Sequence, residues 1–160
     1  MLKVTVVCVG KLKEKYLKEA AAEYSKRLKA FCRFDIIEVD EEKAPESPNE
    51  SQINNILNAE GKRILAKIDK SAKIAAMCIE GRQMSSKAFA QFFSDSALSG
   101  VSSIAFVIGG SWGLSDEVKK RADIKLSMSE MTFPHQLARV MLCEQIYRAF
   151  SINSGTKYHK

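Results

Sequence analysis

The residues best suited to chemistry stand in two short segments in the last third of the chain. The first, Gly109-Gly110-Ser111-Trp112-Gly113, follows directly on the apolar run Ile104–Ile108. The run predicts a buried strand, and glycines after it allow a ligand or another backbone to come close. Three glycines and a large aromatic exceed what a plain strand-to-helix turn requires. Because open α/β sheets bind ligands beyond the carboxyl ends of their strands, this segment predicts one wall of a pocket.

The second segment, Met128–Gln136, carries little charge and ends on Pro134-His135, where a new helix is expected to begin. Two such loops close together predict one shared cofactor pocket. The pocket is not a standard nucleotide-phosphate site. The glycine segment has no lysine for a P-loop, and it lacks the G-x-G-x-x-G spacing of a dinucleotide fingerprint.

Three basic side chains follow on the expected last helix. His135 falls in its first turn, where the positive end of the helix dipole disfavours protonation and leaves a neutral imidazole. Arg139 lies four residues on and shares a helix face with it, and Arg148 lies further along. This helix would present all three side chains toward something anionic. The alternatives are a histidine that only bonds a neighbouring loop and arginines in ordinary surface ion pairs.

The chain ends on an aromatic, an imidazole and a cation, in Tyr158-His159-Lys160. These groups suit base stacking, proton handling and phosphate contact respectively. A disordered end is the usual alternative for such a tail.

Strand and helix patterns alternate along the chain, which predicts an α/β fold with a mostly parallel sheet flanked by helices. No repeat or linker interrupts the pattern, so we expect one domain over residues 1–160. Residues 40–51, with two prolines among acidic and polar side chains, predict a loop. Strands are predicted at Leu2–Val9, Phe34–Val39, Lys73–Ile79, Ile104–Ile108 and Ile124–Leu126. Helices are predicted at Glu14–Phe31, at Gln52–Ile68, from a cap at Ser85 or Ser86 to about Leu98, after Ser115, and from Pro134 to about Ile152.

Composition narrows the class of protein. Hydrophobic residues make up 46% of the 160 residues, as in globular proteins, and the net charge of +6 permits binding to a polyanion without establishing it. Four scattered cysteines and two histidines give no zinc spacing, so we expect no metal and reduced thiols in a cytoplasmic protein. No segment approaches the ~20 apolar residues of a membrane span, and no membrane partner is expected.

Several segments, in order along the whole chain, carry a family resemblance. They are Val9–Glu14, Glu42–Glu46, Gly109–Gly113, Met131–Gln136, Glu144–Phe150 and the final Tyr-His-Lys. In these segments the chain resembles the small bacterial ribosomal RNA large subunit methyltransferases H, within the SPOUT class of knotted methyltransferases. One departure is Met77, where relatives often carry leucine. Another is Lys160, where some relatives have arginine.

The resemblance implies an S-adenosyl-L-methionine-dependent enzyme that methylates N3 of a pseudouridine in large-subunit (23S) ribosomal RNA. It further implies action on assembled ribosomes, a homodimer and a trefoil knot in the last part of the chain. The family pattern assigns the cofactor to Met77, Gly109 and the loop Met128, Ser129, Glu130, Met131, Thr132 and Phe133.

For catalysis we hypothesise that His135 or His159 assists removal of the N3 proton. Arg139 and Arg148 would hold phosphate, and the tail with Tyr158 and His159 would complete a site made mainly by the other subunit. Two alternatives are a non-enzymatic ribosome-binding or assembly factor with the same fold and a SPOUT methyltransferase that acts on transfer RNA. The intact cofactor loops argue against the first, and the lack of extra domains argues against the second.

Overall fold

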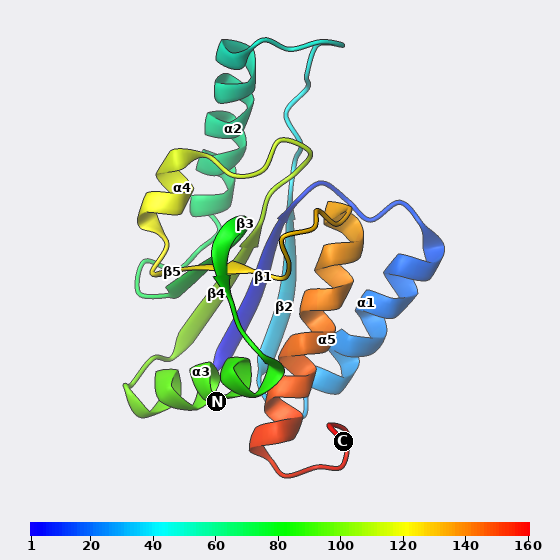
Figure 1. Cartoon of the computed structure of the whole chain (residues 1–160), viewed down its shortest axis with the longest axis vertical. Helices are drawn as coiled ribbons and strands as arrows, with labels where there is room; N and C mark the ends of the chain where they lie inside the picture. The colour runs from blue at the N-terminus through cyan, green and yellow to red at the C-terminus, as the bar shows by residue number, and fades with distance from the viewer.

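Five parallel strands form one sheet in the order β2-β1-β4-β3-β5, with helices on both faces (Figure 1). The computed structural model describes residues 1–160. The predicted α/β class and the parallel sheet are confirmed. The elements are β1 Lys3–Val9, α1 Lys15–Leu28, β2 Arg33–Val39, α2 Glu50–Leu65, β3 Lys73–Gln83, α3 Ser86–Leu98, β4 Ser103–Ile108, α4 Asp116–Arg121, β5 Ile124–Ser127 and α5 His135–Asn153.

Strand β1, in the interior of the sheet between β2 and β4, is buried on both faces, as a strand covered by helices must be. Its Val4, Val6 and Cys8 join a core cluster with residues of α1, α3 and α5. Val7 and Val9 face the opposite way, into a smaller cluster with residues of α2 and α4. This two-residue alternation on a continuous apolar strand builds two cores, one on each face of the sheet. None of the five helices combines the length and apolar character that crossing a membrane requires.

Several helix boundaries differ from the sequence prediction by a few residues. Helix α2 begins at Glu50, before the predicted Gln52, because Asn49 and Gln52 form a reciprocal capping box. Helix α1 ends at Leu28 and not at Phe31. Pro134 is the N-cap of α5, and His135 is its first helical residue.

Strand β3 extends to Gln83, beyond the predicted end at Ile79, and it wraps around β5. Both Met77 and Arg82 pair with Leu126, with a register shift between them. At the bend a Cβ on Gly81 would lie 2.5 Å from the Leu126 carbonyl carbon, so only glycine allows the two backbones to approach this closely. The end of β3 therefore curls around the short strand that leads into the second loop.

Candidate functional site

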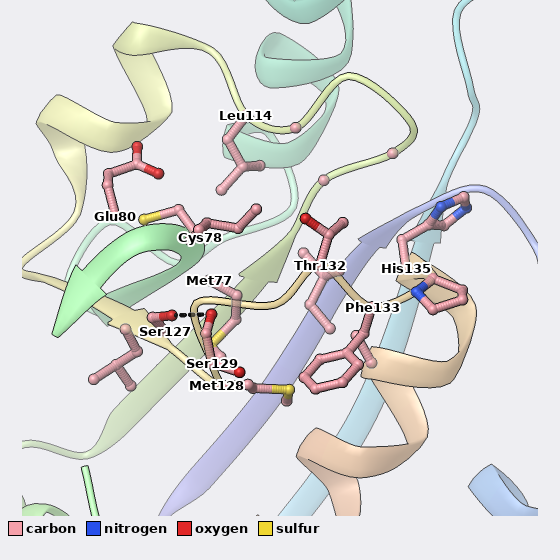
Figure 2. Close-up of a pocket in the computed structure, with 18 of the residues that line it drawn as sticks. Met77, Cys78, Glu80, Leu114, Ser127, Met128, Ser129, Thr132, Phe133 and His135 are labelled. Atoms are coloured by element: carbon pink, nitrogen blue, oxygen red, sulfur yellow. Dashed lines mark hydrogen bonds between the residues drawn. The ribbon is translucent and has the colours of Figure 1, made fainter. Parts of the chain in front are cut away.

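A cavity of about 740 Å³ opens at the carboxyl ends of β3, β4 and β5. The glycine segment after β4 and the loop between β5 and α5 both line it, so the two loops do share one pocket (Figure 2). The chain's single tryptophan, Trp112, also lines the cavity and is 45% exposed. The cavity lies where an open α/β sheet is expected to bind a ligand.

The glycine segment is a tight turn that uses two of its glycines for its own geometry. Gly113 has a φ of +88° and its N–H donates to the Gly110 carbonyl. A Cβ on Gly109 would lie 2.2 Å from the Gly113 carbonyl oxygen. Gly109 and Gly113 are therefore required by the turn itself, which closes only without side chains at these positions, and the prediction that the three glycines exceed the needs of a turn is wrong for these two.

The second loop is held by its own serines. The Ser127 hydroxyl donates to the Ser129 carbonyl at 2.9 Å (Figure 2), and the Ser129 hydroxyl accepts from the Met131 N–H at 3.1 Å. Most of the residues expected to bind a cofactor line the cavity, namely Met77, Gly109, Met128, Ser129, Met131, Thr132 and Phe133. Glu130 does not line it and is exposed.

His135 lines the cavity from the first turn of α5. Its pKa is lowered, as expected, but burial is the largest cause, with the nearby Arg139 and Lys13 cations adding to it and Glu41 opposing it. The helix dipole proposed from the sequence is therefore not needed to explain a neutral imidazole at pH 7.

Arg139 is buried, with 1% of its side chain exposed, and does not line the cavity. Its guanidinium donates to the Glu38 carboxylate at 2.7 Å and to the Gly10 carbonyl at 2.9 Å. The same Glu38 oxygen accepts from the Leu12 N–H. This arrangement leaves no guanidinium surface for RNA, so the expectation that Arg139 contacts phosphate is wrong. The side chain instead ties the start of α5 to β2 and to the loop after β1.

Arg148 belongs to a separate cluster on the second half of α5. It donates to Glu144, stacks on the Tyr158 ring at 4.8 Å and lies 3.3 Å from His159 Nδ1. The Tyr158 hydroxyl also donates to Glu144. The tail is therefore docked on its own helix and not left free. Glu144 follows His135 by nine residues, about 13 Å along the helix, so one chain does not bring His135 and His159 together.

Glu144 also joins the cluster, although its role was not predicted from the sequence. Its spacing of four residues from Arg148 was the available signal. Glu144 lines a second cavity of about 490 Å³, between α5 and the ends of β3 and β5. The two cavities share Met77, Leu126, Ser127 and Met128 as walls. The cluster of Glu144, Arg148, Tyr158 and His159 is thus connected to the main cavity through a second cavity.

The other reactive side chains to consider are potential metal ligands and the cysteines. No group of three or more His, Cys, Asp or Glu side chains is placed to hold a metal ion. All four cysteines are free thiols, as expected. Three are buried, while Cys78 is part-buried and lines the main cavity, where burial is the largest cause of its raised pKa.

Comparison with known proteins places this geometry in a family. Residues 2–159 match a family model described as predicted SPOUT methyltransferase. The chain is 52% identical over 159 residues to proteins from Latilactobacillus sakei and Clostridium kluyveri, and 51% identical to one from Clostridioides difficile. All three are named ribosomal RNA large subunit methyltransferase H, and each match covers 99% of this chain and the whole relative.

The solved structure of a probable methylase family protein from Haemophilus influenzae Rd KW20 shares the fold. Its TM-score is 0.55 at 14% identity, over 98% of this chain and 70% of that one. With a family match over nearly all its residues and relatives at half identity across their full length, this chain belongs to the SPOUT methyltransferase family.

Proposed function

We propose that this protein transfers a methyl group from S-adenosyl-L-methionine to N3 of a pseudouridine in large-subunit ribosomal RNA. The observation that carries the proposal is the cavity formed by the two loops in a chain half identical to ribosomal RNA methyltransferases. The cofactor, when bound, supplies an activated methyl group on a sulfonium. The protein has then mainly to hold the target nitrogen in line with that methyl and to accept a proton.

The residues of the cavity fit this cofactor. Half of the lining residues are hydrophobic, including Met77, Leu114 and Phe133, and these suit the flat faces of adenine. Backbone groups of the glycine segment and of the second loop offer donors and acceptors. Met77, Gly109 and the residues from Met128 to Phe133, with the exception of the outward Glu130, would hold the cofactor.

We further propose that the last part of the chain is threaded as a trefoil knot. The wrapping of β3 around Leu126, with no room for a Cβ at Gly81, supports this. True knots are nearly absent from proteins, so the proposal depends on the family and on this close crossing.

His135 is the proposed proton acceptor, assisted by His159 from a second copy of the chain. A homodimer would bring the cluster of Arg148, Tyr158 and His159 to a partner's cavity, which the separation along α5 prevents within one chain. Arg148 then remains the candidate phosphate contact, while Arg139 acts by positioning the start of α5.

A pH profile tests His135 as the base. The histidine must be neutral to accept a proton, and burial lowers its pKa. We expect turnover to stay constant as pH falls to the ordinary histidine pKa of 6.5 and to decrease only below it. His135→Ala should lose roughly 10²-fold or more in turnover and abolish this acid limb. Leu137→Ala, an exposed neighbour outside the cavity, is the matched control.

His135→Ala and His159→Ala, mixed as denatured and refolded chains, should recover activity that neither has alone if the tail serves the other subunit. Near-normal turnover in both single variants would show that no histidine is the base, and that solvent takes the proton.

The proposed function itself is tested by methyl transfer from labelled S-adenosyl-L-methionine to ribosomes from a strain that lacks the modification. We expect label at a single pseudouridine of the large subunit, with little on naked ribosomal RNA, because a short chain with a net charge of +6 reads a folded surface better than a free stem. Label on transfer RNA would instead support the other SPOUT activity. If the protein bound the cofactor but labelled no RNA, the proposed substrate would be wrong. If it did not bind the cofactor either, the result would favour an assembly factor.

A further inference from the structure

Only two residues that line the main cavity carry a formal charge at neutral pH, and they face each other. Lys119 Nζ on α4 lies 2.6 Å from a Glu80 carboxylate oxygen at the curled end of β3. The hydrogen bond from Lys119 lowers the pKa of Glu80, so the carboxylate is ionised. The other lining residues are apolar, hydroxyl-bearing, thiol or glycine, together with His135 in its neutral form. The cavity thus presents one anion beside one cation.

The proposed cofactor carries the complementary pair. Its amino-acid end has an α-ammonium and an α-carboxylate, while its adenine and ribose are neutral. We propose that Glu80 and Lys119 bind this amino-acid end, with the Glu80 carboxylate accepting from the α-ammonium and the Lys119 ammonium donating to the α-carboxylate. This inference rests on the proposed function, because it assumes that cofactor.

The position of the pair supports this assignment. Figure 2 shows Glu80 beside Cys78 and Leu114 on one side of the cavity, with Phe133 and His135 on the other. A zwitterion that leaves water needs charged or hydrogen-bonding partners. Glu80 and Lys119 are the only lining residues that together offer a negative and a positive charge. The neutral adenine ring, by contrast, is stabilised by contact with the apolar walls of the cavity.

The pair can also exchange partners at little cost. The Glu80 side chain is 54% exposed and that of Lys119 is 26% exposed. Ion pairs this exposed to water contribute only about 0–1 kcal/mol to folding. Opening the pair to admit a ligand is therefore cheap, and replacing either residue should leave the fold intact.

Two ligands separate this role from a general effect on the cavity. S-adenosylhomocysteine has the amino-acid end, while 5′-methylthioadenosine keeps the adenine, ribose and thioether but lacks it. Binding is measured by calorimetry and by the emission of Trp112, the only tryptophan. For Glu80→Gln and Lys119→Met we expect S-adenosylhomocysteine to bind about tenfold more weakly. The affinity for methylthioadenosine should change by less than about twofold, since only S-adenosylhomocysteine makes a charge-assisted contact with the pair. Lys120→Met, exposed on the same helix and outside the cavity, is the control.

In the unaltered protein, raising the salt concentration should weaken the binding of S-adenosylhomocysteine and leave the binding of methylthioadenosine unchanged. Equal losses for both ligands in the variants would assign Glu80 to the ribose hydroxyls or to the shape of the wall, and would overturn the inference. Unchanged affinity for both would overturn it as well. Absence of S-adenosylhomocysteine binding to the unaltered protein would instead refute the proposed function on which the inference rests.

Discussion

Glu38→Ala is expected to destabilise the protein by about 3 kcal/mol, because it leaves the Arg139 cation buried without its counterion. For a chain of this length the melting temperature should fall by roughly 6–12 °C. The value is at the low end for a broken buried pair, since the Glu38 side chain is itself 37% exposed. Arg139→Met should destabilise the protein less than Glu38→Ala does, because it removes the buried charge and leaves the Glu38 carboxylate, which water can reach.

The double variant separates this explanation from a simple loss of contacts. With both charges removed, Glu38→Ala with Arg139→Met should be more stable than Glu38→Ala alone. Thermal melts of the three proteins check this order. A double variant less stable than Glu38→Ala would refute the counterion argument. Glu23→Ala removes an exposed ion pair to Arg27, with side chains 41–51% exposed, and should change stability by less than about 1 kcal/mol.

The same variants should also affect the site, because the pair anchors the start of α5. Arg139 holds the Gly10 carbonyl, and the Gln136 side chain accepts from the Lys13 N–H at 3.0 Å. Both bonds join the loop after β1 to the helix turn that carries His135. We therefore expect Arg139→Met to lower turnover more than it weakens cofactor binding.

Gly109→Ala is expected to weaken cofactor binding more than tenfold, because the added methyl group has no room in the turn. The added Cβ would lie 2.2 Å from the Gly113 carbonyl oxygen, a backbone atom that no side-chain rotation can move. The turn must therefore open, at a cost of about 1–3 kcal/mol in stability. Because this turn is a wall of the cavity, the ligand should lose more than tenfold in affinity.

Neighbouring substitutions provide a graded control for this prediction. A Cβ on Gly110 would lie 3.1 Å from Val9 Cγ1, a contact that a small shift relieves, so Gly110→Ala should have an intermediate effect. Ser111→Ala, exposed in the same turn, should bind ligand normally. Titration with S-adenosylhomocysteine, followed by Trp112 emission, measures all three. Equal affinity in Gly109→Ala and Ser111→Ala would show that the turn tolerates a side chain and that the close approach is not essential.

Much of the fold could be predicted from the sequence because it depends on local patterns. The continuous apolar run of β4 and the alternation of strands with amphipathic helices fix an α/β sheet, whatever the order of its strands. The two loops at the candidate site were found for the same reason. Each follows a strand directly, and in parallel sheets the ends of strands gather at one edge. Residues such as Phe133 and His135 therefore reach the cavity by their place in the chain.

The roles of the charged residues were decided by contacts between distant segments. Spacing placed Arg139 on the same face as His135, but Glu38 lies 101 residues away and turns the arginine into a buried anchor. The pairing of Glu80 with Lys119 likewise requires β3 to curl around β5, which the run Lys73–Ile79 did not predict. A sequence determines which side chains are polar and how they are spaced. What a charge binds depends on which distant backbone excludes water around it, and only the tertiary structure decides that.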